Sequence, residues 1–199
     1  MPQYYMFNKP KDCVTARTDA LSRTVMDYFP EEQRHTLHPS GRLDKDTTGL
    51  LIITDDGMLT HRLMQPKSHV KKTYFFYAIG TLTDEKTEAI RSGITVKGMS
   101  EPLMPAEISM NWQGKITEIE NYLPDKKRES LLKNPAQRVF SGYITIAEGK
   151  NHQVKRMLKA IDCCIVYLHR VSVGAVTLDS SLLPGCYRPL TDDELSSLL

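Results

Sequence analysis

The chain has 199 residues, of which 40% are hydrophobic and 25% are charged, and its formal net charge is +2 at pH 7. This length suffices for one large domain or two small ones with a sizeable core. The longest apolar runs, residues 74–79 and 163–168, are far shorter than the ~20 residues of a membrane helix. No secretory leader is evident at the start, and the four cysteines form no C-x-x-C pair. We therefore expect a cytoplasmic protein with no membrane segment.

In chain order, hydrophobic spacing and turn residues predict a strand at 4–8, a helix at 20–29, a strand at 50–54, a helix at 58–64, a strand at 72–80 and a helix at 84–92. The same patterns then predict a strand at 142–147, a helix at 152–162, strands at 165–168, 170–173 and 175–178, and a C-terminal helix that starts at the capping box of 191–194. Runs of strands interrupted by single helices indicate an α+β fold with a mainly antiparallel sheet.

Residues 121–138 differ in composition from the rest of the chain. Five of these eighteen residues are basic and two are prolines. We expect an exposed basic insertion with one helical turn at 129–133. A solvated segment explains the charges better than contact with a polyanion does.

The predicted helix at 152–162 has two different faces. The basic face carries His152, Lys155, Arg156 and Lys159, and an apolar face carries Val154, Met157, Leu158 and Ile161. The preceding Glu148-Gly-Lys-Asn forms a turn that presents the first free N–H groups of the helix, where phosphate binds readily. A solvated surface helix explains the spacing equally well.

The segment 38–57 places an acid, Asp44, on a loop that leads directly into the apolar residues 50–53. A carboxylate held there has a fixed direction, and a nearby cation such as Arg42 would keep it ionised. It can act as a nucleophile or as a base. Together with a phosphate-binding helix, this suggests chemistry on a nucleotide within a nucleic acid. The alternative is that Asp44 only closes a turn and pairs with Arg42.

Other chemistries fit the residues less well. The run from Asp44 to Asp55 resembles part of a calcium loop, but its ninth position is the apolar Ile52 and its twelfth is Asp rather than Glu. The six histidines lack the spacing of zinc ligands. Neither G-x-G-x-x-G nor G-x-S-x-G occurs. We expect no metal and no cofactor.

Six motifs in order closely resemble the bacterial ribosomal RNA pseudouridine synthases of the small-subunit synthase A type. They are Phe-Asn-Lys-Pro at 7–10, Gly-Arg-Leu-Asp-Lys-Asp-Thr-Thr-Gly-Leu at 41–50 with Thr-Asp-Asp-Gly at 54–57, Lys-Thr-Tyr at 72–74, Glu-Gly-Lys-Asn-His-Gln-Val-Lys-Arg-Met at 148–157, Leu-His-Arg at 168–170 and Pro-Gly-Cys-Tyr-Arg-Pro-Leu-Thr at 184–191. The resemblance spans residues 4–199. It implies the pseudouridine synthase fold: one catalytic domain over 1–199, with two subdomains sharing a bipartite sheet, flanking helices and a central active-site cleft.

The resemblance also implies roles for particular residues. Asp44 matches the nucleophilic aspartate, and Tyr74 matches the tyrosine that stacks on the target base and can assist proton transfer. Lys155 falls where the family has a cation that pairs with the aspartate. The expected substrate-binding residues are Arg42, Leu168, Lys9, His152 and Arg156. Among them, Leu168 would wall the pocket and Arg42 would hold the displaced backbone.

Members of this family isomerise uridine to pseudouridine without a cofactor. The N1–C1′ bond breaks, the uracil turns within the pocket, and C5 is joined to C1′. The base must first leave the RNA stack, which costs a few kcal/mol. Whether the aspartate attacks C1′, attacks C6 or removes a 2′ proton stays open. The expected partner is ribosomal RNA or an assembling ribosomal subunit, bound by a monomer.

Three departures from the family pattern bear on the target. We expect no N-terminal module like that of ribosomal protein S4, Asp12 stands where the family usually has Gly, and the insertion at 121–138 is added. A target in 16S rRNA is our first hypothesis and one in 23S rRNA is the second. The third hypothesis, a non-catalytic RNA-binding or ribosome-assembly factor, is weakened because Asp44, Tyr74 and Lys155 are all present.

Overall fold

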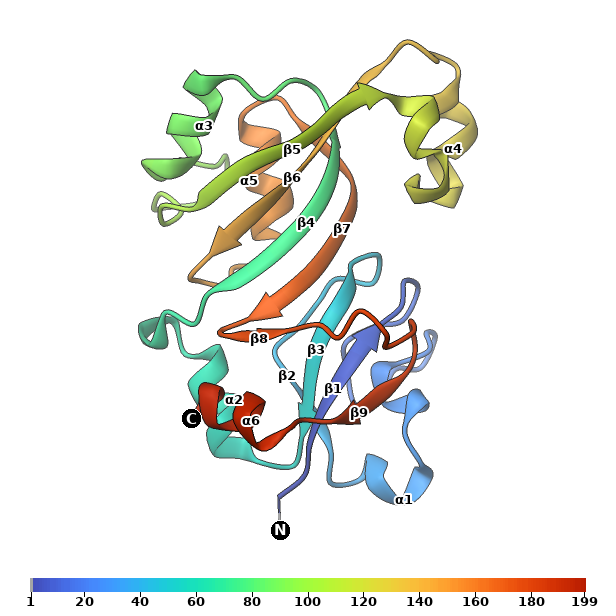
Figure 1. Cartoon of the computed structure of the whole chain (residues 1–199), viewed down its shortest axis with the longest axis vertical. Coiled ribbons are helices and arrows are strands. Elements are labelled where there is room, and N and C mark those ends of the chain that lie inside the picture. Colours follow the sequence, from blue (N-terminus) through green and yellow to red (C-terminus); the bar gives the residue numbers. More distant parts are fainter. Residues whose placement is uncertain (1) are drawn as a thin grey trace. The chain divides into compact units, whose positions relative to one another are not determined.

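The computed structural model describes residues 2–199, which divide into two compact units. Unit 1 comprises the described residues up to Lys72 together with His169–Leu199, and unit 2 is Thr73–Leu168. The chain passes from one unit to the other within two strands, β4 (Lys72–Ile79) and β7 (Cys164–Val173) (Figure 1).

Unit 1 contains most of the short elements: β1 (Tyr4–Lys9), the 3-10 helix η1 (Val25–Tyr28), α1 (Glu31–Arg34), β2 (His38–Ser40), β3 (Thr48–Thr54), α2 (Gly57–Met64), the 3-10 helix η2 (Pro66–Ser68), β8 (Val176–Thr177), β9 (Tyr187–Pro189) and α6 (Asp192–Leu198). Its strands follow the order β7-β3-β1-β9, with β2 paired to β3 and β8 to β7. β3 and β7 pair parallel at two positions, whereas β1, β2 and β9 pair antiparallel with their neighbours.

The core of unit 1 lies between strands β1 and β3 and two helices. Met6, Leu50 and Ile52 are fully buried and pack with apolar residues of α2 and α6. Figure 1 shows these two helices at the same end of the unit. Each such side chain stabilises the fold by roughly 1.5–3 kcal/mol when it is removed from water.

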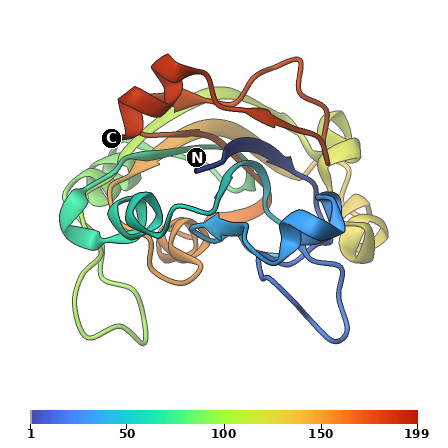
Figure 2. The ribbon, with the colours of Figure 1, turned by 90° about the horizontal axis from the view of Figure 1, so that it is seen from below.

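A loop between β1 and η1, in blue, projects away from these strands (Figure 2).

Unit 2 contains α3 (Asp84–Arg91), β5 (Glu107–Lys115), the 3-10 helix η3 (Ile116–Tyr122), α4 (Asp125–Leu132), β6 (Arg138–Ile146) and α5 (Gln153–Ala160). Its strands follow the order β5-β6-β4-β7, and β5 and β6 pair antiparallel. The predicted α+β fold with a mainly antiparallel sheet is therefore confirmed.

The predicted helix over residues 20–29 is wrong. Only η1 forms, because the Thr24 side chain and Asp27 make a capping box that starts a short 3-10 turn. Just before it, Asp19 Oδ1 accepts hydrogen bonds from the backbone N–H groups of Leu21 and Ser22. These side chains compete with the helical backbone bonds. Leu21, an apolar residue within the predicted helix, is 97% exposed.

Several other elements differ from the prediction in extent. β7 is one continuous strand where two were expected, and α5 starts at Gln153 rather than His152. The insertion contains the eight-residue helix α4, and its Leu123 is buried in a second apolar cluster with Ile116, Ile119 and Val139. β5 was missed because most of its side chains are exposed and do not alternate regularly.

Candidate active site

Asp44 lies in the loop between β2 and β3 of unit 1. The N–H of Thr47 donates to the Asp44 carbonyl oxygen at 3.1 Å, which closes a turn directly after the acid. Immediately before it, Leu43 is buried, and Thr15 Oγ1 donates to its carbonyl at 2.7 Å and accepts from its N–H at 3.2 Å. The backbone is therefore fixed on both sides of Asp44.

Lys9 supports the same loop from the end of β1. Its side chain is fully buried, and its ammonium donates to the carbonyl oxygens of Pro10 at 3.0 Å, Lys45 at 3.3 Å and Thr47 at 2.8 Å. Burial lowers the pKa of Lys9, and the nearby acids Asp46 and Asp44 oppose this shift. The burial argues against the expected contact of Lys9 with RNA and gives it a structural task in the loop.

Behind the loop, β3 approaches β7 very closely at Gly49. A Cβ atom at this position would lie 2.3 Å from the Arg170 carbonyl oxygen, and the backbone has φ +103°. Arg170 is 2% exposed, and its Nε donates to the Leu50 carbonyl at 2.7 Å. His169 Nδ1 lies 2.8 Å from Thr48 Oγ1, and burial lowers the pKa of His169. The strand that follows Asp44 is thus anchored to β7 by both backbone and side chains.

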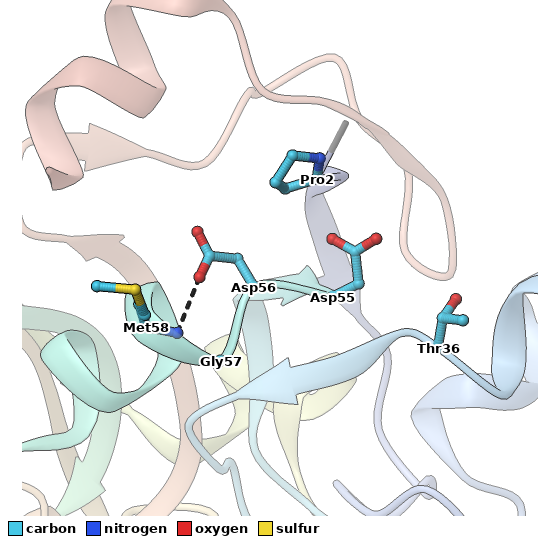
Figure 3. A pocket seen from close by; sticks show the side chains of 6 residues that line it. All are labelled: Pro2, Thr36, Asp55, Asp56, Gly57 and Met58. Carbon is cyan, nitrogen blue, oxygen red and sulfur yellow. Dashed lines mark hydrogen bonds between the residues drawn. The ribbon is translucent and has the colours of Figure 1, made fainter.

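The Thr-Asp-Asp-Gly motif at 54–57 has a structural role. Asp55 accepts from the Gln3 N–H, and Asp56 caps α2 by accepting from the N–H groups of Met58 and Leu59. These acids line an open pocket with Pro2, Thr36, Gly57 and Met58 (Figure 3). Because the carboxylates are used to fasten β1 and start α2, we place no chemistry there.

Arg188, in the motif at 184–191, also serves the fold of unit 1. Its guanidinium binds both carboxylate oxygens of Glu194 at 2.8 Å and Asp179 Oδ2 at 2.9 Å. The hydrogen bond from Arg188 lowers the pKa of Glu194 to about 2. This bidentate pair joins β9 to the first turn of α6, which accounts for Arg188 without any contact to RNA.

In unit 2, Tyr74 and Leu168 are two strand residues of the expected site. Tyr74 is 7% exposed and shares the buried face of β4 with Phe76 and Ala78. Leu168 is 5% exposed in β7. Both have the apolar setting that a wall for a planar base requires.

Helix α5 carries His152, Lys155 and Arg156. His152 is the exposed N-cap residue with left-handed backbone (φ 51°), Lys155 is half-buried, and Arg156 donates to the Lys97 carbonyl oxygen at 3.3 Å. The expected basic face exists, although one of its cations also holds the segment before β5.

A buried network that the sequence did not single out fixes the start of α5. Gln153 Nε2 donates to Glu148 Oε1 at 2.8 Å, and Gln153 Oε1 accepts from the Lys150 N–H at 2.9 Å. Glu148 also accepts from the Met104 N–H at 2.9 Å. The only sequence sign of this network was an acid beside a Gly turn, because Met104 is remote in the chain.

The expected site residues are thus distributed over both units. Unit 1 brings Lys9, Arg42 and Asp44 together around one loop, with Arg42 exposed. Unit 2 holds Tyr74, Leu168 and the three α5 residues. Among residues 2–199, no group of three or more His, Cys, Asp or Glu side chains is arranged to hold a metal ion. Within that same part of the chain, every helix is too short or too polar to cross a membrane.

Comparison with known proteins shows which known fold this structure has. A crystal structure of a pseudouridylate synthase superimposes with a TM-score of 0.82 and 37% identity, covering 100% of this chain and 74% of that one. Residues 3–160 match the family described as RNA pseudouridylate synthase. The fold is therefore the pseudouridine synthase fold.

Two relatives show which type of pseudouridine synthase the chain resembles. The chain is 41% identical to the uncharacterized RNA pseudouridine synthase YtzG of Bacillus subtilis, covering 98% of this chain and 72% of that protein. It is 35% identical to ribosomal small subunit pseudouridine synthase A of Escherichia coli, covering 100% of this chain and 74% of that protein. The chain belongs to the RNA pseudouridine synthase family, in the small-subunit synthase A type, and is an isomerase that acts on RNA.

Proposed function

We propose that the chain isomerises one uridine of ribosomal RNA in the small subunit, with Asp44 as the nucleophile. The observation that carries the role of Asp44 is the support of its loop from both sides, by Thr15 before it and by Lys9 and the Thr47 turn after it. A nucleophile held in this way loses little freedom when it attacks. The choice of the small subunit is supported by relatives that bear that name and are 35–37% identical over nearly the whole chain.

The reaction is balanced within the substrate. The N1–C1′ bond breaks, a C5–C1′ bond forms, C5 loses its proton and N1 gains one, so no co-reactant is consumed. In the proposal Asp44 forms a transient bond to the nucleotide, Tyr74 stacks on the uracil and Leu168 provides an apolar wall. Lys155 is assigned as the cation that pairs with the aspartate, as its position in the family motif implies.

RNA contacts are assigned to cations that are at least partly exposed. Arg42, beside the Asp44 turn, and His152, at the start of α5, are exposed, and Arg156 is half-buried, whereas Lys9 is fully buried. Basic side chains and a helix start position the phosphate backbone without reading its sequence. The assembled ribosomal subunit and its RNA are the proposed partner.

The test maps pseudouridine in ribosomal RNA by carbodiimide modification and primer extension. RNA is compared from cells that carry the wild-type gene, no gene, Asp44→Asn or the control Asp162→Asn. Asp162 is exposed at the end of α5 in a left-handed conformation that Asn also adopts. We expect one 16S site to be lost without the gene and with Asp44→Asn, and retained with Asp162→Asn.

The other outcomes are equally definite. Loss of a 23S site instead would keep the enzyme and its nucleophile but move the target to the large subunit. Retention of every site with Asp44→Asn would refute the assigned nucleophile. Ribosomal RNA that is unchanged even without the gene would refute a ribosomal target.

A further inference from the structure

The loop that follows β1 holds both chain neighbours of Asp44. At its beginning, the Thr15 hydroxyl binds the N–H and the carbonyl oxygen of Leu43. Near its end, Ser22 Oγ accepts from Lys45 Nζ at 3.0 Å. One loop therefore contacts the residue before the proposed nucleophile and the residue after it.

The two side-chain contacts differ in strength; the Asp12 N–H also donates to the Lys45 carbonyl at 2.9 Å. The Leu43 side chain is 6% exposed, and one hydroxyl serves both polar groups of its backbone. Leaving such groups without partners is costly, because buried backbone N–H and C=O groups are almost always paired. The contact between Ser22 and Lys45 is exposed and depends on a long flexible side chain. Thr15 is therefore the main side-chain anchor.

The base of the loop is itself fixed. The N–H of Val14 donates to the Arg23 carbonyl at 2.9 Å, and the N–H of Val25 donates to the Val14 carbonyl at 2.9 Å. Thr15 directly follows this closed base, while the remainder of the loop projects outward (Figure 2). Its hydroxyl thus acts from a rigid support.

We propose that Thr15 is a positioning residue for Asp44, whose hydroxyl sets the peptide that precedes the nucleophile and so aims its carboxylate. The inference rests on the proposed role of Asp44. Thr15 need not touch the RNA: a shift of the Leu43 carbonyl would turn the Asp44 side chain away from the sugar and base. Misplacements of this size reduce rates while leaving substrate binding intact.

The test compares isosteric and conservative substitutions. Thr15→Val keeps the shape and removes the hydroxyl, whereas Thr15→Ser keeps the hydroxyl. Thr36→Val is the matched control, since the Thr36 hydroxyl donates to the nearby Gln33 carbonyl in an exposed part of the same unit. Steady-state kinetics on the target RNA give kcat and KM, and thermal unfolding reports the fold.

We expect Thr15→Val to lower kcat by about tenfold, because a carboxylate that is aimed less well reacts more slowly, with KM changed less than about threefold. Thr15→Ser is expected to restore kcat to near the wild-type value, and Thr36→Val to leave it unchanged. If Thr15→Val does not fold, Thr15→Ala removes the same hydroxyl without the second branch and is expected to show the same fall in kcat.

Two results would overturn the inference. A hydroxyl-free variant that folds and has wild-type kcat shows that the contact to Leu43 does not aim Asp44. Equal losses in Thr15→Val and Thr15→Ser show that keeping the hydroxyl does not preserve kcat, so the hydroxyl is not what aims Asp44. These results are read beside Asp44→Asn: if that variant is inactive, only the role of Thr15 fails, and if it is active, the proposed nucleophile fails as well.

Discussion

Lys9 carries its charge in a place where lysine is rarely found, fully inside the protein. Three backbone carbonyls around its ammonium offset the loss of water, and two of them belong to the loop that carries Asp44. A shorter or uncharged residue would remove these three hydrogen bonds. The lysine of the Phe-Asn-Lys-Pro motif therefore supports the loop that carries Asp44. A long side chain with a donor at its end is needed at this position.

His169 gives unit 1 a dependence on pH. Burial lowers its folded-state pKa below the ordinary value of 6.5, so the folded chain binds this proton less readily than the unfolded chain does. Stability from the neutral ring is present above pH 6.5 and is lost as the pH falls through the folded-state pKa. We expect the free energy of unfolding in urea to fall more steeply from pH 7 to pH 5 in the wild type than in His169→Gln.

The control for this prediction is His35→Gln, which replaces an exposed histidine of the same unit. We expect it to retain the wild-type slope. Identical pH slopes for wild type and His169→Gln would contradict the assignment.

Among the elements, strands β3 and β7 approach each other so closely that position 49 requires glycine. Gly49→Ala would place Cβ 2.3 Å from the Arg170 carbonyl and force a left-handed φ of +103° on alanine. We expect its free energy of unfolding to drop by about 3 kcal/mol or more. Gly57→Ala is the control, because nothing lies within 4 Å of its Cβ position and alanine suits a helix, so stability should stay within about 1 kcal/mol of the wild type. Urea unfolding of both variants measures the difference, and similar losses in the two would contradict the close approach.

Elements held by neighbouring side chains were predictable from the sequence. The Thr191–Glu194 capping box starts α6, as expected, and Thr83 caps α3, where a helix was predicted from residue 84. The same kind of local bond defeated the prediction at residues 20–29, where Asp19 and Thr24 bind nearby N–H groups and stop a regular helix. Hydrophobic spacing alone does not reveal which of these side-chain bonds will form.

The candidate site likewise has parts that the sequence predicted and parts that it did not. The sequence located the Asp44 turn and the basic face of α5, because each lies within one short segment. The groups that hold them come from far along the chain: Thr15 is 28 residues from Leu43, and Lys9 is 38 residues from Thr47. Only the folded chain brings such partners together, so the burial of Lys9 and the role of Thr15 were out of reach of motif reading.

At the scale of the whole molecule, a net charge of +2 is too small to explain RNA binding by total charge. The distribution of charge must therefore decide where RNA binds, and two helices of unit 2, α4 and α5, carry three basic side chains each. In α4 the cations are interspersed with acids, and Arg128 pairs with Asp125 at 3.3 Å. In α5 the residues Gln153–Ala160 include three cations and no acid. We infer that α5 is the stronger attraction for phosphate.

Two double substitutions that remove equal charge separate these helices. Arg156→Gln with Lys159→Gln in α5, and Lys126→Gln with Lys127→Gln in α4, each remove two positive charges. If each α5 cation releases counterions from RNA, the α5 variant should weaken binding and reduce the slope of log K against log salt by about 1.4 to 1.8. The α4 variant should keep the wild-type slope. Because the net charge of the two variants is identical, a larger change in the α4 variant would assign RNA binding to the insertion instead, and equal changes would mean that RNA responds to total charge alone.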